Sequence, residues 1–183
     1  MESCSEVEAE LTVYIHPSQE KDIRSAVARE LSFLLFKHNK IFDGVVVAYN
    51  LKKINNHARI IQGVHPYLAV KLEASLLLFQ PSPNSLIEGK VVKVSEESIH
   101  LIVLGFSSAV INHQDVPQDF KVKHKQGVCA YVSRSSNRHS IKVGSLVRFV
   151  VKSWDEEVLH IFGSLMSPGT GNISWLSKRL EDS

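Results

Sequence analysis

The sequence has few features of a secreted, membrane-spanning or metal-binding protein. Its two cysteines, Cys4 and Cys129, lie far apart, which is typical of free thiols in a reducing compartment rather than of a disulfide framework. The N-terminal stretch MESCSEVEAE is acidic and has no apolar secretory core. No run approaches the roughly 18 apolar residues of a membrane span. We therefore expect a soluble intracellular protein without a membrane anchor.

The sequence also lacks the motifs of common catalytic and cofactor sites. It has neither a Walker phosphate loop nor the GxGxxG pattern of a dinucleotide site. Its nine histidines are scattered, and no two of them form an i, i+4 ligand pair within a predicted helix. Asp43 stands beside Gly44, which is typical of a turn rather than of a general base. We predict no enzyme, no cofactor and no metal site.

The composition is that of an ordinary folded protein. Hydrophobic residues make up 44% and charged residues 22%, so long disordered segments are not expected. The 183 residues can form one large domain or two small ones. The net charge of +2 is smaller than is usual for a dedicated duplex-DNA binder.

The first part of the chain has the patterns of two strands and a helix between them. Alternation from Leu11 to Ile15 predicts a short strand. Ser18 is placed to cap a helix whose apolar residues recur at helical spacing as far as Leu35, with Asn39 as a candidate C-terminal cap. The stretch FDGVVVAYN, residues 42–50, predicts a turn and then a strand buried on both faces.

A long alternating stretch then precedes a proline-rich joint. From Tyr67 to Phe79 every second residue is apolar, which predicts a strand of unusual length that offers a sheet edge. The joint Pro81-Ser82-Pro83 marks a boundary. We therefore predict a small β-α-β-β domain over residues 1–83.

The second part of the chain has the pattern of a five-stranded OB-type β-barrel. We assign this barrel to residues 84–166 and place an irregular insertion, 113–142, between its third and fourth strands. Residues 167–183 follow as a tail. The fold class is thus α+β. The predicted barrel strands are 89–94, 99–104, 108–111, 145–154 and 158–166.

OB barrels bind single strands by stacking bases on aromatic rings while cations follow the phosphates. The candidate RNA-binding residues are His100, Arg148 and Lys152, and Phe106 is more readily explained as a core residue. The stretch from Lys121 to Lys142 holds six Lys or Arg and no Asp or Glu. Such a segment can meet phosphates or an acidic partner surface, or it can be a solvated loop.

Four stretches together resemble the larger stalk subunit of DNA-directed RNA polymerases. Similarity to this family covers nearly all of residues 9–166. DGVVVAY, and GFSSAVI at the third barrel strand, are most similar to the RNA polymerase I version. The four stretches are FDGVVVAYN, YLAVKLEASLLLFQP, EGKVVKVSEESIHLIVLGFSSAVI and the final hairpin VGSLVRFVV…LHIFGSLM.

The resemblance implies a non-catalytic protein of the nucleus and nucleolus. Its tip domain, 1–83, would anchor on the polymerase core subunits through Phe42, Asp43 and Gly44 and the loop through Gly63. A small stalk partner subunit would complete the stalk, and the polymerase I initiation factor would reach it for transcription of ribosomal RNA genes. The barrel would face nascent single-stranded RNA.

One departure from the family pattern concerns RNA. RNA-binding barrels of this type carry two aromatic residues in the turn after Gly-x-Val-x-x-Ile, where this sequence has Glu97 and His100. We therefore expect RNA binding to be weak. The alternatives are a standalone single-stranded RNA-binding module of an RNA-processing complex, a pure interaction scaffold, and a stalk subunit of another nuclear polymerase.

Overall fold

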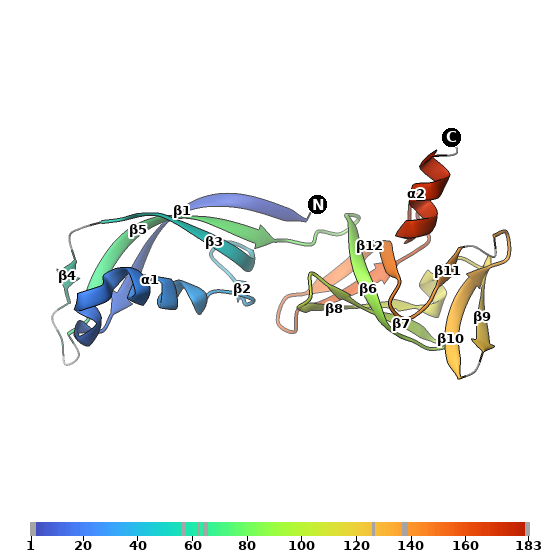
Figure 1. Ribbon diagram of the computed structural model, residues 1–183, viewed down its shortest axis with the longest axis horizontal. Coiled ribbons are helices and arrows are strands. Elements are labelled where there is room, and N and C mark those ends of the chain that lie inside the picture. Colours follow the sequence, from blue (N-terminus) through green and yellow to red (C-terminus); the bar gives the residue numbers. More distant parts are fainter. Residues whose placement is uncertain are drawn as a thin grey trace. The chain divides into compact units, whose positions relative to one another are not determined.

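The computed structural model describes residues 3–55, 58–61, 63, 66–125, 127–136 and 139–181. The chain divides into two compact units: an N-terminal unit, Cys4–Gln80, and a barrel unit that begins at Pro81 and includes Ser3. Over the described residues the N-terminal unit has one sheet and the barrel unit has two, and Figure 1 shows their strands. None of the helices among the described residues is long and apolar enough to cross a membrane.

The N-terminal unit is an antiparallel sheet with one helix. The strands lie in the order β1-β5-β3-β2, and β4 also pairs with β5. The elements are β1 (Cys4–Ile15), the 3₁₀ helix η1 (Pro17–Asp22), α1 (Ile23–Ser32), β2 (His38–Asn39), β3 (Gly44–Ile54), β4 (Arg59–Ile60) and β5 (Leu68–Phe79).

The strand β5 is the centre of this sheet and not its edge. Its alternation was predicted correctly, because Val70, Leu72, Ala74, Leu76 and Leu78 are all at most 2% exposed. They form the core with Ala26, Val27 and Leu31 of α1. The expectation of an open edge at β5 is wrong, since β1 and β3 pair with its two sides. Among the described residues β1 is one edge of the sheet and β2 is the other.

The helix is shorter than predicted. The Asp22 side chain caps α1 by accepting a hydrogen bond of 3.1 Å from the Ser25 N–H. The helix ends at Ser32, and Phe36 then adopts a left-handed φ of 57° while its N–H donates to the Val46 carbonyl. That backbone bond to β3 diverts the chain, so Leu34 and Leu35 pack on the core from outside the helix.

Five strands of the barrel unit close on themselves. The parallel pair β8–β13 and the antiparallel pair β13–β12 complete the ring β6-β7-β8-β13-β12, an OB-like pairing order. The mixed α+β class and the closed five-stranded barrel are thus confirmed. The strands are β6 (Leu86–Val94), β7 (Ser98–Val103), β8 (Ser107–Asn112), β12 (Leu146–Asp155) and β13 (His160–Ser164).

The packing of the barrel core explains why residue 163 is a glycine. Phe149 is fully buried, and a Cβ atom at Gly163 would lie 2.4 Å from its ring. Only a residue without a side chain leaves room for this ring. The core also contains buried aliphatic side chains of β6 and β7, namely Ile87, Val91, Ile99, Leu101 and Val103.

The insertion was predicted to be irregular, and this is wrong. A short 3₁₀ helix, η2 (His113–Asp115), leads into a three-stranded antiparallel sheet in the order β11-β10-β9. The alternation FKVKHK was overlooked because its outward residues are cationic. Tyr131 anchors the sheet, since its buried hydroxyl donates to the Glu96 carbonyl at 2.9 Å. The strands are β9 (Phe120–Lys125), β10 (Val128–Ser133) and β11 (Ser140–Ile141).

The segment predicted as a tail, 167–183, is instead folded onto the barrel unit over its described residues. It forms β14 (Gly171–Asn172), which pairs with β12, and α2 (Ile173–Glu181). The Trp175 ring stacks on the His139 ring, with centroids 3.9 Å apart and planes 1° apart. This contact ties α2 to the insertion sheet.

Candidate nucleic-acid and docking interfaces

Three neighbouring barrel strands present one continuous outer face. Side chains of β7, β8 and β13 alternate in direction, and the registers place the outward ones in two rows, of which Val110 is the one that is nearly buried, at 9% exposure. One row is His100, Val110 and Phe162, and the other is Ile102, Ser108 and His160. We call these six residues the outer strand face.

Hydroxyl groups position both histidines of this face. Ser108 Oγ lies 2.7 Å from His160 Nδ1, and Ser98 Oγ lies 3.0 Å from His100 Nε2. The Phe162 side chain is 40% exposed, and its ring meets the His160 ring edge-on at a centroid distance of 4.9 Å. An exposed ring held by a neighbour is a suitable surface on which a nucleobase can stack.

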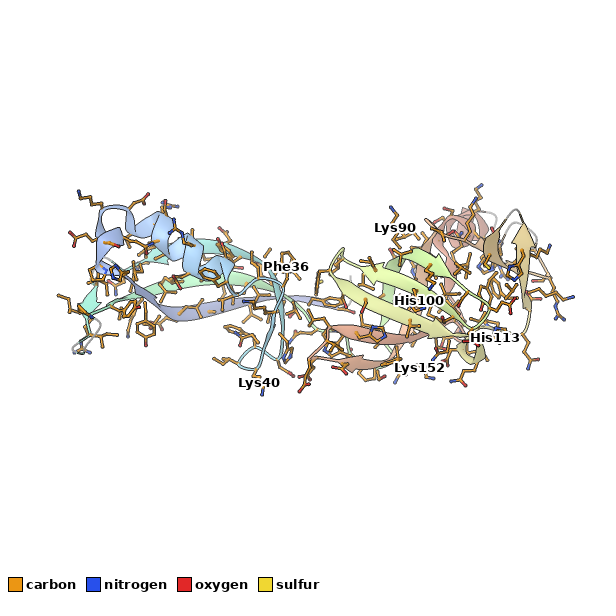
Figure 2. All side chains as sticks on the ribbon, turned by 90° about the horizontal axis from the view of Figure 1, so that it is seen from below. Phe36, Lys40, Lys90, His100, His113 and Lys152 are labelled. Carbon is orange, nitrogen blue, oxygen red and sulfur yellow. The ribbon has the colours of Figure 1, made fainter. Side chains whose placement is uncertain are left out.

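The charge on the β6 side of the outer strand face is positive, whereas on its other side the exposed Asp155 of β12 lies opposite His160. Lys90 and Lys93 of β6 lie opposite Ile102 and His100 in the register, and both are exposed. Figure 2 labels Lys90 and His100 on the barrel unit. In the described part of the chain neither lysine makes an ion pair, and no outward residue of β7, β8 or β13 is acidic. These lysines are therefore available to phosphates.

Two of the three predicted RNA-binding residues are already paired with carboxylates. Arg148 donates to Glu88 Oε1 from Nε at 3.0 Å and from Nη2 at 2.7 Å. Lys152 Nζ lies 2.8 and 3.1 Å from the carboxylate oxygens of Asp115, a residue only 8% exposed. The charges of both cations are largely compensated, so His100 alone among the three belongs to the outer strand face.

The sequence reasoning missed His160 and Phe162. The alternation in LHIFGS sets these two on one side of β13 and Ile161 and Gly163 on the other, which is the signal that could have identified them. Phe106 is half-buried. Glu97 is exposed in the turn between β6 and β7, where its carbonyl accepts from the His113 N–H at 2.7 Å.

In the N-terminal unit, the predicted docking residues Phe42 and Asp43 lie in the turn before β3, and Gly44 is the first residue of that strand. Phe42 is half-buried against the core, and Asp43, with a φ of 48°, holds the left-handed conformation. Gly44 is buried, and φ there is not positive. Gln80 Nε2 holds this turn by donating to the carbonyls of Phe42 at 3.1 Å and Asp43 at 3.0 Å.

Gly63 does not lie with this turn. It precedes the first residue of β5, whereas Gly44 adjoins Val45, the partner of Phe79 at the last residue of β5. A strand of 12 residues is roughly 40 Å long, so the sheet separates the two glycines. Figure 1 shows β4 and β2 at opposite ends of the unit.

A different group of apolar residues surrounds the turn. The side chains of Phe33, Phe36 and Ile41 are 60%, 51% and 87% exposed. Beside them lies a groove of about 550 Å³ along β1, lined in part by Leu11, Leu34, Ile41 and Phe42. Exposed apolar side chains gathered beside a groove are typical of a protein-binding surface.

Comparison with known proteins identifies relatives that are named as subunits of RNA polymerase I. No family model matches the chain. It is 26% identical over 153 residues to a probable DNA-directed RNA polymerase I subunit RPA43 of Dictyostelium discoideum, which covers 82% of this chain and 42% of the relative. It is 25% identical over 112 residues to the rpa43 subunit of Schizosaccharomyces pombe, covering 61% of this chain and 64% of the relative.

A third relative is the RNA polymerase I subunit RPA43 of Danio rerio, 26% identical over 109 residues, or 58% of this chain and 28% of the relative. The chain thus spans less than two thirds of each relative's length. A crystal structure assigned as an exosome complex RNA-binding protein matches this chain with a TM-score of 0.35 and 18% sequence identity. The match covers 52% of this chain and 49% of that one. This similarity is too low to support a functional conclusion. The three relatives confirm the predicted resemblance of this chain to the larger stalk subunit of RNA polymerase I.

Proposed function

We propose that this protein is a non-catalytic stalk subunit of nuclear RNA polymerase I. The observation that carries this proposal is the similarity to polymerase I subunits over 82% of the chain, an extent that takes in residues of both units. In this function the N-terminal unit is the tip domain that docks on the polymerase core, and the OB-type barrel faces emerging RNA. The protein then acts in the nucleolus, in transcription initiation at ribosomal RNA genes.

Affinity purification of the tagged protein from nuclear extract tests this function. The large polymerase I subunits should co-purify, together with a small stalk partner subunit and, in part, the polymerase I initiation factor. Recovery of the large subunits of another nuclear polymerase instead would assign the protein to that enzyme. Absence of every polymerase subunit would contradict the proposal.

Docking of the N-terminal unit is best assigned to its exposed apolar residues. Phe42, Asp43 and Gly44 shape the turn, but Ile41 is the side chain that projects from it, with 87% of its surface exposed. Replacing Ile41 by Glu should therefore release the protein from the polymerase without unfolding it. Val143→Glu, at a residue 52% exposed in the barrel unit, is the matched control and should leave co-purification unchanged.

Contact with nascent RNA is assigned to the outer strand face. Phe162 and His160 offer a stacking surface, and Lys90 and Lys93 offer charge to the phosphates. This face has one exposed phenylalanine ring rather than two, so binding should be weak and without sequence preference. Fluorescence anisotropy with single-stranded RNA, on the chain alone and with the small partner subunit, measures this activity.

A standalone RNA-binding module is the alternative function. It also uses the outer strand face, but it requires no polymerase. The two functions differ in the purification experiment: a standalone module should recover RNA or RNA-processing proteins and no large polymerase subunit. Tight RNA binding by the isolated chain would favour this alternative.

A further inference from the structure

A groove of about 760 Å³ lies beside the insertion sheet. Its walls come from η2, from the segment leading into β9, and from residues after β10 and β13. None of the six residues of the outer strand face lines it. Its lining combines polar residues with apolar ones: His113, Gln114, Val116, Pro117, Gln118, Phe120, Lys121, Val122, Arg134 and Met166.

The open edge of β9 borders this groove. Within the described residues β9 is the outermost strand of its sheet, as Figure 1 shows. Phe120, Lys121 and Val122 all line the groove. Because successive side chains of a strand point to opposite faces, all three can line it only if the edge of the strand faces the groove.

Val122 offers backbone groups on this edge to another strand, whereas the Phe120 N–H already donates to the Pro117 carbonyl at 3.0 Å. Arg134 and Asp119 form a hydrogen-bonded pair, since the Arg134 N–H donates to the Asp119 carbonyl at 2.8 Å. From this pair the register between β10 and β9 runs without a shift as far as Tyr131, which lies opposite Val122. In an antiparallel ladder such hydrogen-bonded pairs alternate with pairs whose backbone groups point outward. The N–H and C=O of Val122 therefore point away from β10.

The charge of the groove is positive. Lys121 and Arg134 are both exposed, no carboxylate is among the lining residues, and in the described part of the chain neither cation makes an ion pair. Of the nearest acidic residues in the sequence, Asp115 binds Lys152. Hydrogen bonds from Ser133 and Ser135 lower the pKa of Asp119, and the charge of Arg134 lowers it further, so Asp119 partly compensates Arg134. Lys121 is therefore the more available of the two cations.

Part of the lining of the groove is aliphatic. Of its aliphatic lining residues, Val116 is 6% exposed and Met166 is 60% exposed. The Phe120 ring is held edge-on against the His139 ring, with centroids 4.9 Å apart, so it is already packed inside the sheet. Val116, Val122 and Met166 thus give the groove aliphatic contacts for the side chains of a bound segment.

We propose that this groove receives an extended, acidic segment of a partner protein, which adds to β9 as a further strand. Main-chain hydrogen bonds at Val122 hold the segment, Lys121 and Arg134 pair with its carboxylates, and its aliphatic side chains contact Met166. A second copy of this chain fits poorly, because two β9 edges would bring lysines together. The proposal does not depend on the polymerase assignment.

Binding of a fluorescent peptide that alternates Glu with Val, measured by anisotropy on the full chain, tests the proposal. Saturable binding is expected. The double variant Lys121→Glu/Arg134→Glu should weaken it by about tenfold, because two ion pairs are replaced by repulsion. The matched variant Lys142→Glu/Lys178→Glu changes the net charge equally outside the groove and should bind as the unmodified chain does.

Two further probes test the mode of binding. Peptides methylated on alternate backbone nitrogens, in the two possible sets, should differ sharply in affinity, because an added strand uses only one set. A single-stranded RNA should fail to displace the peptide. Absence of saturable binding, equal weakening in the matched variant, equal affinity of both methylated peptides, or displacement by RNA would each overturn the proposal.

Discussion

The backbone of Gly44 lies so close to Gln80 that a Cβ atom at Gly44 would stand 2.6 Å from Gln80 Cγ. The Gln80 side chain is not free to turn aside. Its Nε2 donates to two carbonyls of the turn before β3, and its Oε1 accepts from Ser5 Oγ at 2.6 Å. This one side chain connects the turn to β1, and Gly44 provides the space for it.

Replacing Gly44 by Ala should lower the free energy of unfolding of the N-terminal unit by about 1–3 kcal/mol, because the added methyl group displaces the anchored Gln80 side chain. Urea unfolding monitored by circular dichroism measures this change. Gly63→Ala is the matched control, since nothing lies within 4 Å of its Cβ direction, and it should be nearly neutral. Equal stability of both variants would show that Gln80 adapts freely.

Replacing Phe162 by Ala should weaken binding of single-stranded RNA by about fivefold or more, because one stacked base is worth about 1–3 kcal/mol. Anisotropy titration at low salt gives the affinity. Phe33→Ala removes another exposed ring, from the N-terminal unit, and should leave RNA affinity unchanged. If Phe162→Ala binds RNA as well as the unmodified chain, the outer strand face is not the RNA site.

Replacing both Lys90 and Lys93 by Ala should flatten the dependence of RNA affinity on salt. Each lost phosphate contact reduces the slope of log K against log salt by about 0.7 for a single strand. Titrations at several ionic strengths give the slope. An unchanged slope would mean that these lysines do not meet phosphates.

Lys152→Ala should lower the stability of the barrel unit rather than change the salt dependence of RNA binding. It leaves the carboxylate of Asp115 without its cation, at a cost of about 1–3 kcal/mol, while the salt slope stays the same. Thermal unfolding and the same RNA titrations separate these two effects. A reduced slope without loss of stability would restore Lys152 as an RNA contact.

Replacing Glu97 by Phe should tighten RNA binding by about tenfold, because the turn between β6 and β7 then offers an additional ring for stacking. The Glu97 side chain is exposed, so the change should not alter stability. Glu97→Gln removes the charge without adding a ring and distinguishes repulsion from stacking. If the Gln variant gains as much affinity as the Phe variant, charge alone explains the effect.

Acidification should destabilise the packing of α2 on the insertion sheet through His139. Burial lowers the pKa of His139 below its ordinary value, aided by Arg179 and opposed by Asp119. Its Nε2 also accepts from the Asn172 N–H at 3.2 Å. The unfolded chain therefore binds a proton at His139 near pH 6.5, whereas the folded chain binds it only at lower pH. Acid thus favours the unfolded chain, so the stability of the fold is greatest above that pH and falls below it.

Thermal unfolding between pH 7.5 and about 5 tests this expectation, with His139→Phe as the comparison. The variant keeps a ring against Trp175 but cannot be protonated, so its melting temperature should fall less on acidification. Parallel curves for the two proteins would indicate that other groups determine the pH dependence.

The fold was predictable wherever apolar residues alternate without interruption. The pattern from Tyr67 to Phe79 identified β5, and the final hairpin was identified in the same way. The insertion sheet was missed because its strand β9 carries lysines on its outward positions, which resemble a solvated loop. The end of α1 was misplaced because a backbone bond from Phe36 to Val46, outside the helix, decides where the chain turns.

The candidate site was less predictable because pairing partners lie far apart in sequence. Glu88 is 60 residues from Arg148, and Asp115 is 37 residues from Lys152, so nothing local indicated that these cations are compensated. Phe162 is a candidate RNA-binding residue because the strand register places it in a row with His100 and Val110, and this register is not visible in the sequence.

The parallel pairing of β13 with β8 has a consequence for the order of events during synthesis. His160 and Ser108 are 52 residues apart, whereas β9 and β10 are joined by a tight turn at Gly127, with a φ of +77°. Local hairpins form early and distant pairings late. The insertion sheet can therefore form before β13 pairs with β8, and the outer strand face, which needs Phe162, exists only after the last barrel strand has emerged.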